Sequence, residues 1–192
     1  MAKLFFRYGV MNSGKTTNLL QVAHNYEEHG MRVILMKVKA DTKGADYVLS
    51  RLGIKRKVDF LVDNNDNIKE MILAEHKKNP IHCILVDEAQ FLNKQHCNDL
   101  LAIVIHHNIP VICYGLRTDF RREAFEGSSR LMMLAHTIEE LKTVCKCGKK
   151  AIFNARKING KYTRDGNQLA IDGVDEVSYE SFCGTCYEEL FE

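Results

Sequence analysis

The stretch Gly9-Val10-Met11-Asn12-Ser13-Gly14-Lys15-Thr16 decides the fold of this 192-residue chain. It follows the pattern G-x-x-x-x-G-K-[ST], in which glycines allow backbone N–H groups to surround phosphate oxygens. An apolar run, Leu4 to Tyr8, precedes it, and the segment from Gly14 to Tyr26 carries apolar residues at helical spacing. Strand, loop and helix in this order predict a nucleotide phosphate site, with Lys15 at the β- and γ-phosphates and Thr16 on Mg²⁺.

The segments that follow continue the alternation of strand and helix. In order, we expect a strand over Val33–Met36 after a helix stop at Gly30, a helix around Ile68–Glu75, a strand over Ile81–Val86, a helix around Leu100–Ile105 and a strand over Ile109–Tyr114. This order predicts an α/β fold of the P-loop NTPase type, with a parallel sheet covered by helices on both faces. The active site is then expected at the carboxyl ends of the strands.

Two acidic residues, Asp87 and Glu88, end the apolar run of the third expected strand. In a P-loop protein this position places Asp87 against Mg²⁺, opposite Thr16. Glu88 is the candidate general base, because an acid beside the metal carboxylate can accept a proton from an attacking hydroxyl. Arginines would stabilise the transferred phosphate, and spacing does not choose among the five eligible ones, which are Arg51, Arg117, Arg121, Arg122 and Arg156.

Two close pairs of cysteines mark the C-terminal part of the chain, Cys145 with Cys147 and Cys183 with Cys186. Four thiolates in this arrangement are typical of a closed, structural zinc site, and reduced cysteines without metal are the alternative. Few apolar runs occur after position 142, so a metal would have to stabilise this part. We therefore predict a nucleotide-binding domain over 1–142 and a small zinc-binding unit over 143–192.

Composition narrows the class of protein further. Hydrophobic residues make up 45% and charged residues 27%, close to the globular average, and the formal net charge is only +2. The basic residues are scattered among acidic ones and form no stripe of the kind that would predict nucleic-acid binding. No apolar run approaches the ~20 residues of a membrane span, and no targeting segment is recognised, so we expect a cytoplasmic protein that binds neither nucleic acid nor membrane.

The order and separation of these motifs resemble those of type II thymidine kinases, over nearly the whole chain. The resemblance rests on the phosphate loop, on Val86-Asp87-Glu88-Ala89-Gln90-Phe91, on the cysteine quartet and on Tyr114-Gly115-Leu116-Arg117-Thr118-Asp119-Phe120, which is similar to the bacterial branch. It implies an ATP-dependent thymidine kinase with Mg²⁺ and structural Zn²⁺, acting in nucleotide salvage. It also implies a homotetramer and feedback inhibition by thymidine triphosphate.

The resemblance further implies roles for individual residues. Glu88 would accept the proton of the thymidine 5′-hydroxyl, with Lys15 as its catalytic partner, and Asp87 to Gln90 would contact the nucleotide. The implied substrate contacts are Met11, Asp41, Arg51, Phe91, Leu116, Phe120, Asn154, Arg156, Gln168, Leu169, Ala170, Ile171 and Tyr179. Of these, 168–171 correspond to the family's lasso loop, and Asp172 departs from the glycine that usually follows it.

Two other classes of protein share parts of the pattern. Asp87-Glu88-Ala89-Gln90 also resembles helicase boxes, which makes a nucleic-acid-dependent motor one alternative, although the chain lacks room for a second motor domain. A nucleotide-binding switch is the other alternative, and stimulation of ATP turnover by a nucleoside would separate it from a kinase. The sequence leaves open whether deoxyuridine is accepted beside thymidine.

Overall fold

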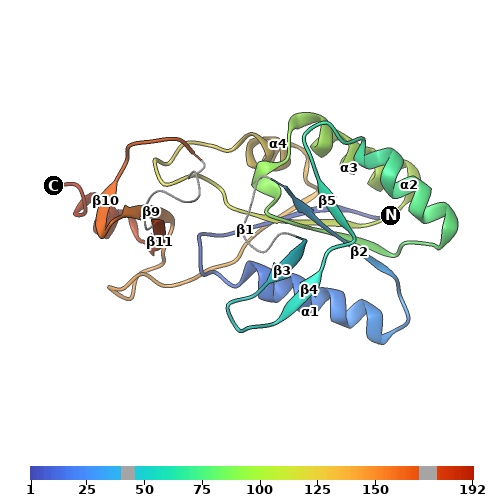
Figure 1. Cartoon of the computed structure of the whole chain (residues 1–192), viewed down its shortest axis with the longest axis horizontal. Helices are drawn as coiled ribbons and strands as arrows, with labels where there is room; N and C mark the ends of the chain where they lie inside the picture. Colours follow the sequence, from blue (N-terminus) through green and yellow to red (C-terminus); the bar gives the residue numbers. More distant parts are fainter. Residues whose placement is uncertain (40–45, 169–176) are drawn as a thin grey trace.

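A six-stranded sheet forms the centre of the protein in the computed structural model, which describes residues 1–39, 46–168 and 177–192 (Figure 1). Its strands are β1 (Leu4–Tyr8), β2 (Val33–Val38), β5 (Phe60–Val62), β6 (Cys83–Asp87), β7 (Val111–Gly115) and β8 (Thr137–Glu140). They lie in the order β5-β2-β6-β7-β1-β8, and all neighbouring pairs are parallel. The predicted parallel sheet is therefore confirmed, and β7 separates the strand before the phosphate loop from the strand that ends at Asp87.

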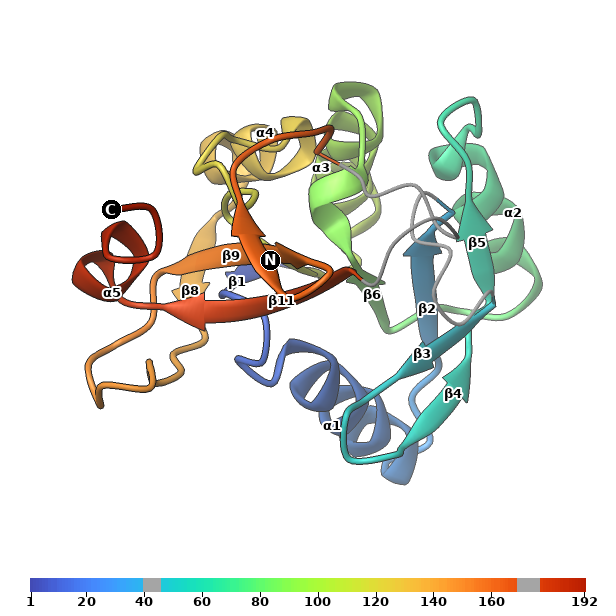
Figure 2. The same cartoon turned by 60° about the vertical axis from the view of Figure 1, so that its left-hand side comes forward.

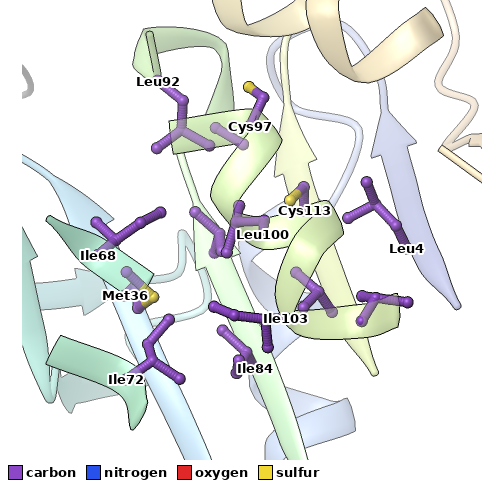
Figure 3. Packing of buried hydrophobic residues seen from close by; sticks show 14 of the residues in the cluster. Leu4, Met36, Ile68, Ile72, Ile84, Leu92, Cys97, Leu100, Ile103 and Cys113 are labelled. Atoms are coloured by element: carbon purple, nitrogen blue, oxygen red, sulfur yellow. The ribbon is translucent and has the colours of Figure 1, made fainter. Parts of the chain in front are cut away.

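Helices cover both faces of this sheet, as predicted (Figures 1 and 2). Helix α1 (Lys15–Glu28) packs on one face, and α2 (Ile68–Lys78), α3 (Lys94–His107) and α4 (Glu126–Leu134) pack on the other. Figure 3 shows the second of these layers, where Met36 and Ile84 of the sheet meet Ile72, Leu100 and Ile103 of the helices. These side chains are at most 1% exposed, because each strand is apolar toward both faces.

Two helices begin at asparagine caps that the sequence analysis did not identify. Asn67 Oδ1 accepts a hydrogen bond from the Glu70 N–H at 3.1 Å, at the start of α2. Asn93 Oδ1 accepts from the His96 N–H at 2.8 Å, at the start of α3. Each cap satisfies a backbone donor that lacks a partner within the helix. The structure also contains elements that apolar spacing did not predict, among them α4, the strands β5 and β8, and a hairpin of β3 (Tyr47–Leu49) and β4 (Lys55–Lys57).

The C-terminal part forms a second, smaller sheet. Strands β9 (Phe153–Ile158), β10 (Lys161–Thr163) and β11 (Val177–Phe182) are antiparallel in the order β10-β9-β11, and helix α5 (Gly184–Glu188) follows. A core of its own contains three of the four quartet cysteines, and Val10 of the phosphate loop packs into it. Figure 2 shows this sheet in front of β1. The boundary at 142/143 stays a prediction.

No helix in the described parts of the chain combines the length and the apolar character needed to cross a membrane.

Candidate active site

The phosphate loop leaves β1 at Gly9 and enters α1 at Lys15. Gly14 has φ +78°, a left-handed conformation that glycine adopts without the steric cost of a side chain. The Lys15 ammonium donates hydrogen bonds to the carbonyls of Val10 at 2.8 Å and Gly9 at 3.3 Å. It is thus held over the loop, at the N-terminus of α1, where the helix dipole and free N–H groups attract an anion.

Four charged residues predicted to act on phosphate share one electrostatic environment. Burial lowers the pKa of Lys15, the charges of Glu88 and Asp87 oppose this shift, and Arg51 adds to it. Burial, followed by the charge of Glu88, raises the pKa of Asp87, against a hydrogen bond from the Glu88 N–H and the charge of Lys15. Lys15, Asp87 and Glu88 therefore lie close together at the carboxyl edge of the sheet, and the charge of Arg51 also reaches Lys15. Thr16 follows Lys15 in the first turn of α1. Asp87 and Thr16 are the residues that would hold Mg²⁺.

Lys37 is a charged neighbour that the sequence analysis missed. It lies on β2 directly opposite Asp87 of β6 and is only 3% exposed. Its ammonium donates to the Tyr47 carbonyl at 3.3 Å, and its charge lowers the pKa of Asp87. The signal was available, because Lys37 ends an apolar run at the same sheet edge as Asp87.

Glu88 occupies a left-handed backbone conformation, with φ 52° and ψ 39°. Such values are uncommon outside glycine and cluster at functional sites. A single 3₁₀ turn, η1 (Ala89–Phe91), follows and carries Gln90, whose side-chain amide donates to Glu88 Oε2 at 2.6 Å. The same amide accepts from the Leu116 N–H at 3.1 Å. The proposed base is therefore connected to the loop after β7.

Alternate residues of two C-terminal strands form a polar face toward the phosphate loop. Asn154 and Arg156 lie on β9, and their partners across the sheet are Ser181 and Tyr179 on β11. Asn154 Oδ1 accepts from the Met11 N–H at 2.8 Å, and the Ser181 hydroxyl donates to the Met11 carbonyl at 2.5 Å. The C-terminal sheet thus holds one residue of the phosphate loop, Met11, through both its backbone N–H and its carbonyl.

The other half of this face meets the loop after β7. The Arg156 guanidinium, 2% exposed, lies 3.6 Å from the centre of the Phe120 ring, within the range of a cation–π contact. It also donates to the backbone carbonyls of Asp165 and Asn167, the latter at 2.8 Å. The Tyr187 hydroxyl donates to the Phe120 carbonyl. Phe120 and Arg156, both predicted substrate contacts, are therefore adjacent, and Tyr179 lies beside Arg156 on the sheet.

Asp119 was not among the predicted site residues, yet it organises the same loop. Its buried carboxylate accepts from the backbone N–H groups of Arg121 at 2.8 Å and Glu123 at 2.9 Å. Gln168, the first lasso residue, donates to it at 3.3 Å. The loop before Phe120 and the start of the lasso are therefore joined. The remaining lasso contacts predicted at Leu169, Ala170 and Ile171, and that at Asp41, lie outside the described residues.

The other predicted residues have contacts elsewhere. Phe91 packs edge-to-face against Phe125, with ring centres 5.5 Å apart. Three of the eligible arginines have partners of their own: Arg117 lies over the Tyr8 ring, Arg121 binds Asp119 and Arg122 binds Glu188. Of the five candidates, Arg51 is the one whose charge acts on Lys15.

The four cysteines converge at the base of the C-terminal sheet. Their sulfur atoms all lie within 4.8 Å of one another, and those of Cys147 and Cys183 are 3.5 Å apart. A tetrahedral Zn²⁺ with Zn–S bonds of 2.3 Å requires sulfur separations of about 3.8 Å. The donor set therefore fits a tetrahedral metal ion, as predicted.

The thiols of the quartet differ in acidity. Burial opposes ionisation of Cys145, but hydrogen bonds from the Cys147 and Cys183 backbone lower its pKa to about 6. Hydrogen bonding with Cys147, together with burial, raises the pKa of Cys186 to about 12. A bound cation favours the ionised form of every ligand, because thiolates and not thiols coordinate metal.

Comparison with known proteins gives consistent matches over the full chain. The family described as thymidine kinase matches residues 2–187. The thymidine kinase of Shewanella oneidensis is 46% identical over 192 residues, covering 99% of this chain and 98% of that protein. Those of Streptococcus gordonii and Enterobacteria phage T4 are 44% and 45% identical, covering 100% and 99% of this chain and 97% of each relative.

A more distant likeness was found among solved structures. Bacteroides Pif1 bound to single-stranded DNA has a TM-score of 0.36 and 14% identity, covering 69% of this chain and 32% of that one. At this level the likeness carries no argument about function.

Proposed function

Because the chain belongs to the thymidine kinase family, we propose that it transfers the γ-phosphate of ATP to the 5′-hydroxyl of thymidine in nucleotide salvage. The observation that carries the proposal is the position of Glu88. Glu88 follows Asp87 directly, and its negative charge raises the pKa of Lys15. Its carboxylate is also joined, through Gln90, to the loop that carries Leu116 and Phe120. A proton acceptor between a phosphate site and an acceptor site is what transfer to a hydroxyl requires.

In the proposed reaction, Glu88 accepts the proton of the 5′-hydroxyl as its oxygen bonds to the γ-phosphorus. The bond between the γ-phosphorus and the β,γ-bridging oxygen breaks, and ADP leaves. Lys15 and Arg51 neutralise charge on the phosphate oxygens, and the backbone N–H groups of the phosphate loop orient them. Asp87 and Thr16 would hold Mg²⁺, which would supply further charge neutralisation when bound with ATP.

The polar face of the C-terminal sheet and the loop around Phe120 form the proposed thymine pocket. Apolar and aromatic walls with a few placed polar groups are typical of sites for flat heterocycles. Phe120, Leu116 and Tyr179 provide the walls in this proposal. The lasso, 168–171, completes the pocket by resemblance to the family.

Further properties belong to the same proposal. Zn²⁺ is the metal of the cysteine quartet, the protein is a cytoplasmic homotetramer, and thymidine triphosphate inhibits by occupying the substrate site. Light scattering of the purified protein tests the tetramer, and thymidine-competitive inhibition by the triphosphate tests the last point.

The test of the reaction is ADP formation from magnesium-ATP with and without thymidine. Deoxyuridine, cytidine and single-stranded DNA serve as parallel additions. We expect stimulation by thymidine, and stimulation by DNA alone, or by none of these, would overturn the proposal.

Replacing Glu88 by Gln tests the role of the base. We expect kcat to fall about 10²- to 10⁴-fold while ATP binding, measured by titration with a non-hydrolysable analogue, is retained. The matched control is Glu70→Gln, an exposed glutamate on α2, which leaves kcat unchanged. Full activity of Glu88→Gln would remove Glu88 as the base.

A further inference from the structure

Gln90 makes two side-chain hydrogen bonds that the assignment of 87–90 to nucleotide binding does not explain. It is 2% exposed and lies in the turn η1. Its Nε2 donates to Glu88 Oε2 at 2.6 Å, and its Oε1 accepts from the Leu116 N–H at 3.1 Å. Since a backbone N–H only donates, the amide oxygen must face Leu116, which leaves the amide N–H₂ for the carboxylate. The orientation of the amide is therefore fixed by its partners.

The surroundings of Gln90 fit this arrangement closely. A Cβ on Gly115 would lie 2.9 Å from Gln90 Oε1 and 3.0 Å from the Gln90 backbone nitrogen. Glycine at the end of β7 is what lets the turn after β6 approach Leu116. The next peptide is also held, because the Leu116 carbonyl accepts from the Ser128 hydroxyl near the start of α4. The residue that carries the N–H bound by Gln90 is therefore held through both of its backbone polar groups.

Glu88 needs such a support. Its backbone is in the left-handed region, which a glutamate enters only when neighbouring contacts impose it. Within the described residues, the hydrogen bond from Gln90 is the one that restrains its carboxylate. Without this bond, the side chain would rotate among several rotamers at the mouth of the site.

We infer that Gln90 is a positioning residue for the general base: it fixes Oε2 of Glu88, leaves Oε1 to take the proton, and ties the base to the loop that carries Leu116 and Phe120. This inference rests on the proposed function. Base and acceptor pocket then share one rigid frame, so that a bound nucleoside and Glu88 keep their mutual distance. Pre-set geometry of this kind acts on the chemical step and not on ground-state binding.

The test uses two substitutions of Gln90 in the full-length protein. Gln90→Met keeps the volume and removes both hydrogen bonds, and Gln90→Glu keeps the acceptor for Leu116 but loses the donor to Glu88. We expect kcat to fall about 10- to 100-fold in both, with the KM values for thymidine and ATP changed less than about threefold. Gln95→Met, at an exposed glutamine on α3, is the matched control and keeps the wild-type kcat.

A double-mutant comparison separates positioning from a general loss of structure. In the Glu88→Gln background, Gln90→Met should lower the residual single-turnover rate no further, because the group that it positions is already absent. An equal fold-loss in both backgrounds, or a kcat unchanged by Gln90→Glu, would overturn the inference. Thymidine-dependent activity of the wild-type protein together with inactive Glu88→Gln would in that case leave the proposed function standing. A wild-type protein that ignores thymidine would overturn both.

Gly115→Ala tests the hydrogen bond between Gln90 and Leu116 without changing Gln90 itself. It remains informative if Gln90→Met does not fold. Its added methyl would displace the Gln90 amide, so we expect the same fall in kcat with KM retained. A wild-type kcat for a folded Gly115→Ala would count against the inference.

Discussion

The carboxyl edge of the main sheet and the polar face of the C-terminal sheet both contribute to the site, but they are built differently. At the sheet edge, Lys15, Asp87 and Glu88 come from two short contiguous motifs, and buried strands hold them on either side. At the C-terminal face, Asn154 and Ser181 are distant in sequence and are brought together by the pairing of β9 with β11, in a small sheet with few core residues. The residues proposed to bind phosphate thus lie in short contiguous motifs, whereas those proposed for the acceptor side come from strands that pair over a long range in the sequence.

Two of the contacts between these regions involve Met11 and Phe120. Met11 is bound by Asn154 and Ser181, and Phe120 is bound by Arg156 and Tyr187. Tyr187 follows Cys186 directly, so a quartet cysteine is next in sequence to a residue that contacts Phe120. We therefore expect substitutions in the C-terminal unit to affect the phosphate loop. The size of each effect should depend on the contacts that the substitution removes.

The largest effect is expected from loss of a metal ligand. Cys183→Ser removes one of four donors from a unit whose core is too small to fold alone, and structural Zn²⁺ contributes about 10–16 kcal/mol in zinc-finger peptides. We expect zinc, measured by elemental analysis, to fall from about one to well under one per chain, and thymidine phosphorylation to fall more than about 10³-fold. Cys97→Ser, at a buried cysteine outside the quartet, is the control and keeps its zinc. Full activity in metal-free Cys183→Ser would show that the two regions are independent.

The contrast between the regions also explains what could be predicted from sequence. The parallel sheet, the phosphate loop and the position of Asp87 and Glu88 followed from apolar runs and motifs, because a buried parallel strand is apolar on both faces. The C-terminal strands lack such runs. Phe153 and Ala155 of β9 face the small core, while Asn154 and Arg156, which alternate with them, face the phosphate loop and the loop around Phe120. Apolar and polar residues alternate here over only a few positions, and the apolar ones are too few to indicate a strand.

Other residues were missed because their roles come from distant partners. Ser181 could have been found from the same alternation, two residues after Tyr179, but only once β11 was known to pair with β9. Gln90 was assigned to the nucleotide by resemblance, and nothing in its own segment indicates the Leu116 N–H that orients it. Asp119 accepts from backbone N–H groups two and four residues later, a local pattern typical of Asp in turns, but its link to Gln168 comes from a distant part of the chain.

A smaller effect is expected where the sheet holds Met11. Ser181→Ala removes one hydrogen bond and leaves the Met11 carbonyl without this partner, a change worth about 1–3 kcal/mol for a buried group, or roughly 5- to 100-fold in kcat/KM for ATP. Ser178→Ala, on the opposite face of the same strand, is the matched control and is expected to be neutral. Identical kinetics for the two variants would mean that the phosphate loop keeps its shape without the C-terminal sheet.

The smallest effect is expected at two carboxylates near the surface, Glu188 on α5, which is exposed, and Glu75 on α2, which is partly exposed. Hydrogen bonds from Arg164 and Arg122 lower the pKa of Glu188 on α5. Those from Lys78 and Arg32 lower the pKa of Glu75 on α2 in the same way. A carboxyl whose pKa is depressed in the folded state stabilises that state above its unfolded pKa of about 4.3, and this contribution is lost as pH falls through the folded value. Each Glu→Gln variant should therefore be less stable than the wild type at pH 7 and equally stable near pH 3. Added salt should reduce the difference in stability at pH 7.

The two carboxylates stabilise different parts of the molecule, so their loss should be detected by different measurements. Glu188 joins α5 to the loop through Arg122, so Glu188→Gln should speed release of zinc to a chromogenic chelator at pH 7 and leave the main thermal transition nearly unchanged. Glu75→Gln should lower that transition slightly, since Glu75 joins α2 to Arg32 before β2, and should not alter zinc release. The reverse pattern, or equal changes in both measurements for both variants, would show that the two sheets unfold as one cooperative unit.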